Sequence, residues 1–599
     1  MTYPENQANQ AIQDQSENSA TALCEENEQG FEPGSSVNSS YLADSCAHAA
    51  TMATTLALAA CGGGSAAVSS PPVPTPPPVV TPPPTPAPIS VADASRFLMQ
   101  ASMGANRSQI AHVQSVGYAA WLDEQFALPA SGSRWDWLVS KGFDALTNKN
   151  SQAGFDASTW RKLISAPDTL RQRITLALSE IIVVAIGGLV GGAGWKAFGA
   201  AGFLDMLEAN CFGDYRNLLQ LVSTSPAMGL YLTFRGNVKY NPVTGALPDE
   251  NYAREIMQLF SVGLLQLNTD GTPKTQNGVP VETYGLDDIT GLARIFTGWD
   301  FDLAGGTVNT PDFMRRAMLQ IASRHETGAA SFLGSTVPAG LSGADALKMA
   351  LDIIFAHPNV APFISRQLIQ RLVTSNPLPA YVARVAAVFN NDGNGVKGNL
   401  KAVIKAILLD DEARNKSNLS NPQFGKVREP IMRFLTWARA FNASSATDTW
   451  ALGDTSDPAK KLGQSPSRSP SVFNFFRPGY VPPNSAIATA ALVAPEFQLV
   501  NESSVVGYVN FMQNAVAHTG GVGDLLADYT GLLPLADNAT TLLDEINLLL
   551  AAGQISDATM SILRNAVSSM ASGSDAARSK RIYAALTLVL AAPEFIVLK

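Results

Sequence analysis

The chain has 599 residues, of which 46% are hydrophobic and 15% are charged, and its formal net charge is −9. This length is ample for a large buried core. The acidic balance, without concentrated Lys and Arg, disfavours a general attraction to nucleic acid or anionic lipid, so we expect no nucleic-acid partner.

Four cysteines are spread along the chain, at Cys24, Cys46, Cys61 and Cys211. The sequence has no CxxC pair and no Cys/His cluster, so these residues predict neither a zinc site nor a disulfide framework. Only Cys211 falls in the region expected to fold. We expect it to be a small buried side chain.

The first 47 residues are rich in Asn, Gln, Ser and Glu and poor in large apolar residues. Such a segment cannot bury enough surface to fold alone, so 1–47 is predicted to be disordered. Residues 48–61 follow as a candidate lipoprotein signal region. There Leu58-Ala59-Ala60-Cys61 resembles a bacterial lipobox, in which the chain is cut before the cysteine and Cys61 carries the lipid.

Two observations bear on this signal. No Lys or Arg precedes Arg96, so the basic region that normally precedes the apolar core of a signal peptide is missing. A misassigned start or an upstream frameshift would explain this, and a short Ala-rich helix ending in Cys-Gly is the structural alternative. We nevertheless expect an exported lipoprotein of the periplasm or outer membrane, held to the membrane by a lipid anchor only.

The tract that follows, 62–90, is predicted to be a Gly/Pro-rich linker. Eleven of the eighteen residues 71–88 are proline. Proline favours the extended polyproline II conformation, which would make this tract a stiff spacer on the order of 50 Å long. A spacer of this kind would hold a folded domain away from a membrane surface.

Residues 91–599 show helical spacing almost throughout, with apolar residues at three- and four-residue steps. We predict a mainly α fold: one large multi-helical domain with long loops and at most a small hairpin. Gly117 is expected to separate two helices within 110–126, and 491–512 to form one long helix. Strand is expected only within 300–332, besides a hairpin or loop at 269–283 with Asn277-Gly278 as a turn signal.

Two segments need a choice between interpretations. The apolar run 170–186 contains Glu180 and ends in a cluster of glycines, so it is too short for a membrane span and predicts a buried helix. The sequence SVFNFFRPGY at 471–480 is the densest aromatic cluster of the chain. It predicts either a loop pinned into a groove or a partner-binding patch.

The stretch from Asp249 to Asn268 is predicted to be a core helix around which the rest is organised. Its apolar face would carry residues from Tyr252 to Leu267, while Arg254 and Glu255 stay off that face. A second helix is predicted from Leu286 towards Trp299. We expect the two helices to pack together.

These two segments also carry a resemblance to a known family. Residues 249–267, ITGLARIFTGW at 289–299 and RHETGAASFLG at 324–334 resemble signature blocks of the bacterial family catalogued as domain of unknown function 1800, and RFLMQASMG at 96–104 and LRQRITLALSE at 170–180 agree. The resemblance implies an exported protein. It also implies a cell-envelope partner from a second family, domain of unknown function 1501, which looks like the alkaline-phosphatase and sulfatase group.

Polar residues gather beside the predicted core helix. If the blocks converge in space, Glu255 or Asp288 would be a general base or metal ligand and His325 an acid/base. Carboxylates with a histidine would suit a divalent metal ion, although no particular cofactor is indicated.

Three further residues are predicted to bind: Arg254 or Arg294 would hold an anion, and Trp299 would stack on a sugar or peptide ring. The alternative is structural. Arg254, Glu255, Asp288 and Arg294 would then form a buried ion-pair network, His325 would bond a backbone carbonyl, and Trp299 would belong to the core.

The first functional hypothesis is therefore a helical binding and assembly scaffold of the cell envelope. The second is a metal-assisted hydrolase that acts on an envelope polymer.

Overall fold

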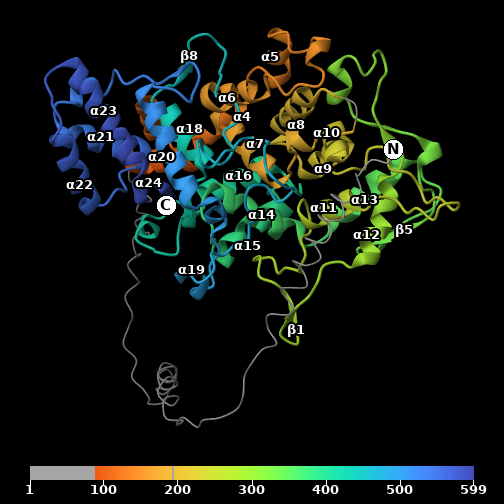
Figure 1. Cartoon of the computed structure of the whole chain (residues 1–599). Helices are drawn as coiled ribbons and strands as arrows, with labels where there is room; N and C mark the ends of the chain where they lie inside the picture. The colour runs from red at the N-terminus through yellow and green to blue at the C-terminus, as the bar shows by residue number, and fades with distance from the viewer. Residues whose placement is uncertain (1–87, 192–193) are drawn as a thin grey trace, which may run out of the picture. The chain divides into compact units, whose positions relative to one another are not determined.

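The computed structural model describes residues 88–191 and 194–599. The predicted disordered segment 1–47, the signal region 48–61 and the linker up to residue 87 lie outside these residues. The described part is mainly helical, with 52% helix and 5% strand, which confirms the predicted fold class. Figure 1 shows helices throughout, joined by long connections and accompanied by very small sheets.

The first group of helices runs to residue 231. It comprises α2 (Val91–Ala101), α3 (Arg107–Val116), α4 (Tyr118–Ala127), α5 (Arg134–Ser140), α6 (Phe155–Ser165), α7 (Thr169–Ile181), α8 (Lys196–Asn210), α9 (Tyr215–Thr224) and α10 (Pro226–Tyr231), with the 3₁₀ turns η1 (Leu146–Asn148) and η2 (Ile186–Gly188). Gly117 separates α3 from α4 with φ of 85°, as its spacing predicts. The apolar run 170–186 contains the buried helix α7, which ends at Ile181, before the end of the run.

The middle of the chain contains α11 (Asn251–Gln258), α12 (Leu286–Ala293) and most of the small strands. The strands are β1 (Thr275–Gln276), β2 (Val279–Pro280), β3 (Trp299–Asp300), β4 (Leu319–Gln320), β5 (Ala330–Phe332) and β6 (Ser335–Val337), and the 3₁₀ turns are η3 (Arg294–Phe296), η4 (Pro311–Arg315) and η5 (Ala322–Arg324). β1 and β2 form the expected hairpin around Asn277-Gly278.

The second half is again helical. Its helices are α13 (Gly343–Ala356), α14 (Val360–Leu372), α15 (Pro379–Asn390), α16 (Leu400–Leu409), α17 (Asp411–Arg414), α18 (Pro430–Ala440), α19 (Ala486–Thr489), α20 (Glu502–Ala517), α21 (Ala539–Ala551), α22 (Asp557–Ser568), α23 (Asp575–Leu590) and α24 (Pro593–Ile596). Between them lie η6 (Lys416–Leu419), η7 (Pro495–Leu499), η8 (Leu533–Leu535) and the strands β7 (Lys426–Val427), β8 (Ser444–Ser445), β9 (Leu525–Leu526) and β10 (Val597–Leu598).

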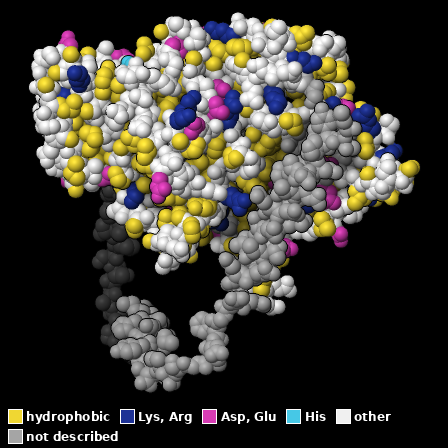
Figure 2. Space-filling view, viewed as in Figure 1, with side chains coloured by type: hydrophobic (Ala, Val, Ile, Leu, Met, Phe, Trp, Pro, Cys, Tyr) yellow, Lys and Arg dark blue, Asp and Glu magenta, His cyan; other side chains and the backbone are white. Residues whose placement is uncertain are grey.

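Sequence pattern explains these helices locally. In α13 the Ser342 hydroxyl accepts the Asp345 amide and caps the first turn, and Leu347, Leu351 and Ile354 recur at helical spacing and are buried. Similar faces meet in one hydrophobic core that runs through most of the described residues. On the face in Figure 2, acidic and basic side chains are scattered among apolar and polar ones. Within the described residues, no helix combines the length and apolar character needed to cross a bilayer.

The predicted core helix is wrong in its length, since α11 ends at Gln258. Val262 and Gly263 both donate their amides to the Met257 carbonyl, which closes the helix, and Gly263 has φ of 72°. Residues 264–267 then run extended and pair with 281–283, and Leu264 is 55% exposed. Pairing with the β1–β2 hairpin therefore overrides the helical spacing of this stretch.

Two further predictions are corrected. The expected helix over 491–512 begins only at Glu502, because Pro495 and the left-handed Ala491 interrupt it and Asn501 caps the new start. Strand is also not confined to 300–332 and the hairpin. β7 pairs with β10 and β8 pairs with β9, each antiparallel over two residues. Strands this short show no alternating pattern, and they join segments that are far apart in the sequence.

Candidate functional site

Glu255 lies on α11 with its side chain almost wholly buried. Its Oε2 has no hydrogen-bond partner among the described residues. Burial raises the pKa of this carboxyl to about 7, and the neighbouring Arg254 opposes the rise. The pKa values of two partly buried phenols, Tyr231 and Tyr284, are raised mainly by burial and further by the nearby Glu255 charge. Glu255 therefore has the pKa of a general acid or base at neutral pH.

Asp288 stands at the start of α12, where both carboxylate oxygens are engaged by backbone. Oδ2 accepts the Gly285 amide at 2.8 Å and Oδ1 accepts the Leu333 amide at 2.7 Å. The first contact closes the first turn of the helix, and the second fastens the β5–β6 turn to it. In this geometry Asp288 acts as a cap that joins two elements.

His325 is 2% exposed and follows η5. Its Nδ1 lies 3.2 Å from the Thr297 carbonyl oxygen and 3.2 Å from the Thr297 hydroxyl. Burial lowers the pKa of His325, so the ring is neutral at pH 7 and donates its Nδ1–H to the carbonyl. This is the contact that the structural alternative expects.

The three predicted binding residues lie apart. Arg254 is half exposed and pairs with Glu250, with Nη2 3.6 Å from Oε2. Arg294 pairs with Glu326 at 3.4 Å. The Trp299 ring is buried in β3, and its Nε1 donates to the Ile295 carbonyl at 3.4 Å.

Within the described part of the chain, no hydrogen bond or ion pair joins the side chains of these six residues to one another, although the Arg254 charge acts on Glu255. Each of the six residues has its own local surroundings. Within the described ranges, no group of three or more His, Cys, Asp or Glu side chains has the spacing of a metal site. Their roles in catalysis and binding remain predictions, and Glu255 is the one whose environment favours chemistry.

A second buried centre, which our sequence reasoning missed, lies between α7, α14 and α18. Glu180 and Glu429 face each other there. Burial, together with the Glu429 charge, raises the pKa of Glu180 well above its usual value. The charges of Lys426 and Arg371 hold the pKa of Glu429 well below its usual value despite its burial, and Gln464 donates to its Oε2 at 2.7 Å. The two neighbouring carboxyl groups therefore have pKa values shifted in opposite directions.

Basic side chains surround this pair. Arg371 Nη1 lies 3.4 Å from Glu180 Oε2, and the Lys426 ammonium lies 3.6 Å from Glu429 and 3.0 Å from Glu496. Glu180 also lines a narrow cavity with room for about one water molecule, which is too small for a substrate. The predicted aromatic cluster covers this region in part: Phe476 is buried and its ring packs under the Arg371 guanidinium at 4.4 Å.

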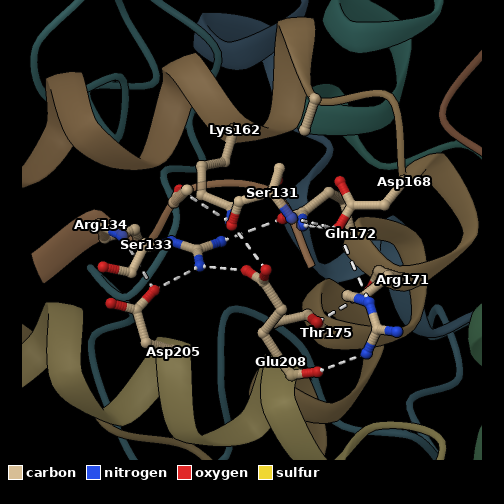
Figure 3. A network of polar contacts seen from close by, with 12 residues as sticks. Ser131, Ser133, Arg134, Lys162, Asp168, Arg171, Gln172, Thr175, Asp205 and Glu208 are labelled. Atoms are coloured by element: carbon tan, nitrogen blue, oxygen red, sulfur yellow. Dashed lines mark hydrogen bonds and ion pairs between the residues drawn. The ribbon is translucent and has the colours of Figure 1, made fainter. Parts of the chain in front are cut away.

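A third buried centre joins α5, α6, α7 and α8, and Figure 3 shows its side chains pointing toward one another. Glu208 accepts from Arg134 at 2.7 Å and from Lys162 at 2.7 Å, and all three side chains are at most 4% exposed. Arg134 also reaches Asp205 at 3.1 Å and Gln172 at 3.3 Å. These contacts lock four helices together.

Several buried basic residues bind the backbone carbonyls at the end of another helix. Arg439 of α18 donates to the Leu163 carbonyl at 2.7 Å and to the Ala166 carbonyl at 3.2 Å, at the end of α6. The last carbonyls of a helix lack partners within it and attract positive charge. Burial lowers the pKa of Arg439 only to about 10, so it stays charged. The same arrangement, a buried cation on another helix's terminal carbonyls, is made by Arg96, Lys426, Arg428 and Arg581.

One signal for these centres was present in the sequence. Glu180 is the single acidic residue of the run 170–186 and is followed directly by Ile181, Ile182, Val183 and Val184, and an acidic residue inside a buried helix needs a buried partner. Its partners on α14 and α18 lie far away in the sequence, so spacing alone could not name them.

Together these features define a large helical protein in which two buried centres pair charges with each other, several buried cations bind helix ends, and Glu255 stands apart without such a partner. The chain belongs to the family described as protein of unknown function (DUF1800), whose model matches residues 96–597, as the signature blocks indicate. No curated protein matches the chain, and no solved structure does.

Proposed function

We propose that the chain is an exported, lipid-anchored protein of the cell envelope whose helical domain is a rigid scaffold for binding and assembling other envelope components. The observation that carries this proposal is that buried charged side chains link different helices. Arg134, Lys162 and Arg439 each bridge different helices through a buried contact of 2.7 Å. Hydrogen bonds to charged groups contribute roughly 1.5–3 kcal/mol each, so these bridges favour one stiff body.

The anchor rests on sequence. Leu58-Ala59-Ala60-Cys61 supplies the site of cleavage and lipid attachment, and the proline tract supplies a spacer between that site and the domain. The proposed location is the periplasmic space or the outer membrane. The proposed protein partner is a member of the domain-of-unknown-function 1501 family, a proposal that rests on the family resemblance alone.

The anchor is tested by metabolic labelling with radioactive palmitate and by fractionation of cells that express the full chain. We expect wild type in the membrane fraction with label, and Cys61→Ser in the soluble fraction without label. Cys46→Ser is the matched control and should behave as wild type. Wild type that is unlabelled and soluble would contradict the proposal.

Glu255 supports a second candidate function, a hydrolase that acts on an envelope polymer. Its raised pKa and the free Oε2 suit proton transfer at neutral pH. A metal-assisted version with Asp288 and His325 finds less support, because backbone amides occupy both Asp288 oxygens and His325 is held on Thr297. If the hydrolase function holds, Glu255→Gln abolishes activity in a folded protein and His325→Gln does the same.

A further inference from the structure

An open pocket with a volume of 460 Å³ lies where three segments meet: the end of α5 and the turn after it, the start of α6, and the segment after β8. α5 and β8 lie along the same edge of the described fold in Figure 1. Pockets that hold small ligands typically have volumes of about 300–1,000 Å³. None of its lining residues belongs to Glu255's surroundings or to the two other buried charged centres described above.

Aromatic rings form one wall of the pocket. The rings of Trp137 and Phe143 stack with centroids 6.2 Å apart and an angle of 28° between their planes. Gly154 lies in the same wall with φ of 82°, and a Cβ there would come within 2.6 Å of the Phe143 ring. The glycine therefore allows Phe143 to lie close beside α6. The result is an apolar surface next to open space.

Polar groups form the opposite rim. The Lys141 ammonium lies 2.7 Å from Asp448 Oδ2 and 5.5 Å from the Trp137 ring centroid. Asp448 keeps 54% of its side chain exposed, and its neighbour Thr449 is also exposed. Both side chains can accept hydrogen bonds from a ligand.

The charges around the pocket are balanced in pairs. Lys141 neutralises Asp448, and Arg468 binds both oxygens of Asp156 at 2.8 and 2.7 Å. Arg468 also lies 3.4 Å from Asp454, so the charged side chains that line the pocket are each engaged by a partner and none is free to hold an ion. The pocket favours a neutral ligand that has an apolar face and several hydroxyl groups.

The Asp448 carboxylate is held in position. Trp450 Nε1 donates to Asp448 Oδ1 at 2.7 Å, and the Thr447 hydroxyl is fixed on Asp524 at 2.6 Å. Asp448 and Trp450 both have left-handed backbone, with φ of 54° and 48°. A carboxylate fixed in this way does not have to be ordered when a ligand binds, which favours affinity.

We propose that this pocket is a saccharide-binding site. The C–H face of a sugar ring packs on the Trp137 and Phe143 wall, and its hydroxyl groups donate to Asp448 and Thr449. Phe143 is partly exposed in this wall and Trp137 is 9% exposed behind it, and an apolar aromatic edge beside a fixed carboxylate suits an uncharged sugar. The site is independent of the lipid anchor and of any protein partner, so its failure would leave the scaffold proposal untouched.

Isothermal titration of the full-length protein with chitotriose, cellotriose and maltotriose tests the site, with tetra-alanine as a peptide probe. We expect at least one trisaccharide to bind with a dissociation constant of about 1 mM or tighter. Asp448→Asn, an isosteric change at an exposed residue, should weaken that binding about tenfold or more. Thr449→Val should also weaken it.

Asp136→Asn is the matched control, because Asp136 is an exposed carboxylate on α5 that does not line the pocket. It should bind as wild type does. The proposal is overturned if none of the three trisaccharides binds at 10 mM, a concentration about tenfold above the expected constant. It is also overturned if only tetra-alanine binds, or if Asp448→Asn and Thr449→Val both bind as tightly as wild type.

Discussion

Substitution of Glu208 by Gln removes one charge from the centre in Figure 3 while keeping the shape of the side chain. Glu208 is the acceptor for two buried cations, Arg134 and Lys162, each at 2.7 Å. The amide has one oxygen, so it can accept from only one of them, and neither cation can move into water. Breaking a buried pair in this way costs roughly 3–5 kcal/mol. Because Arg134 keeps Asp205, we expect a loss near the lower limit, about 3 kcal/mol.

The pH dependence of this loss has a definite sign. Arg134 and Lys162 hold the pKa of Glu208 below its ordinary value of 4.5 although burial opposes ionisation. A lowered folded pKa stabilises the protein above the unfolded pKa, and this contribution disappears as pH falls through the folded value. The difference in stability between wild type and Glu208→Gln should therefore be full at pH 7 and shrink below pH 4.5.

A double substitution separates charge balance from packing. In Glu208→Gln, Asp205 is the only carboxylate left beside Arg134 and Lys162. Lys162→Met then removes the surplus positive charge and replaces the side chain with an apolar one of similar length. We expect the loss of stability in the double variant to be smaller than the sum of the two single losses by at least about 1 kcal/mol.

Urea or thermal unfolding followed by circular dichroism measures these differences. Glu124→Gln is the control, since Glu124 pairs with His112 where both side chains are about half exposed, and exposed pairs contribute about 0–1 kcal/mol. If Glu208→Gln lost no more stability than this control, or if the two losses simply added, the reasoning about buried charge would be wrong.

Three further outcomes are expected. Burial raises the Glu255 pKa from 4.5 to about 7, so the folded wild type keeps a proton that the unfolded chain loses, and its stability falls between pH 5 and 8 by on the order of 3 kcal/mol. Glu255→Gln should lack this pH dependence and be the more stable protein at pH 8. Equal pH dependence of the two proteins in urea unfolding would contradict this expectation. Asp288→Ala leaves the amides of Gly285 and Leu333 without acceptors and should lower the free energy of unfolding by about 1–2 kcal/mol, whereas an unchanged value would show that Asp288 is no cap. Gly291→Ala would place a Cβ 1.9 Å from the Ser331 carbonyl oxygen and should lower the melting temperature through a loss of roughly 1–3 kcal/mol in stability. Gly285→Ala is the control, because a Cβ at Gly285 meets nothing within 4 Å. Equal melting temperatures for the two variants would refute the close approach of α12 to β5.

Local pattern was sufficient where a segment's neighbours do not change its preference. The break at Gly117, the Asn277-Gly278 hairpin and the presence of a buried helix in the run 170–186 are all read from residues within a few positions, although that helix ends at Ile181, earlier than the run does. The stretch after Gln258 shows the limit, since its apolar spacing suits a helix while its backbone pairs with residues 281–283. Tertiary hydrogen bonds decided that segment.

The same limit applies to the interior charges. The sequence pattern placed Glu180 and Glu255 on predicted helices, but it did not show which residues contact them. Glu180 meets Glu429, almost 250 positions later, and Glu255 is close to Tyr231 at the end of α10 and to Tyr284 just before α12. Contacts at such separation leave no periodic trace in one sequence. Asp288 was misleading for another reason, because a helix cap and a metal ligand use the same residue type.

The most direct test of the claim that this chain acts as a scaffold, without chemistry at Glu255, is complementation by Glu255→Gln. A strain that lacks the gene is compared for detergent sensitivity after restoring wild type or the variant, with abundance followed by immunoblotting. The scaffold account predicts that the variant restores resistance as fully as wild type does. A variant that is present at wild-type abundance, melts at or above the wild-type temperature and still leaves cells as sensitive as the deletion would contradict it and establish the carboxyl as a chemical group.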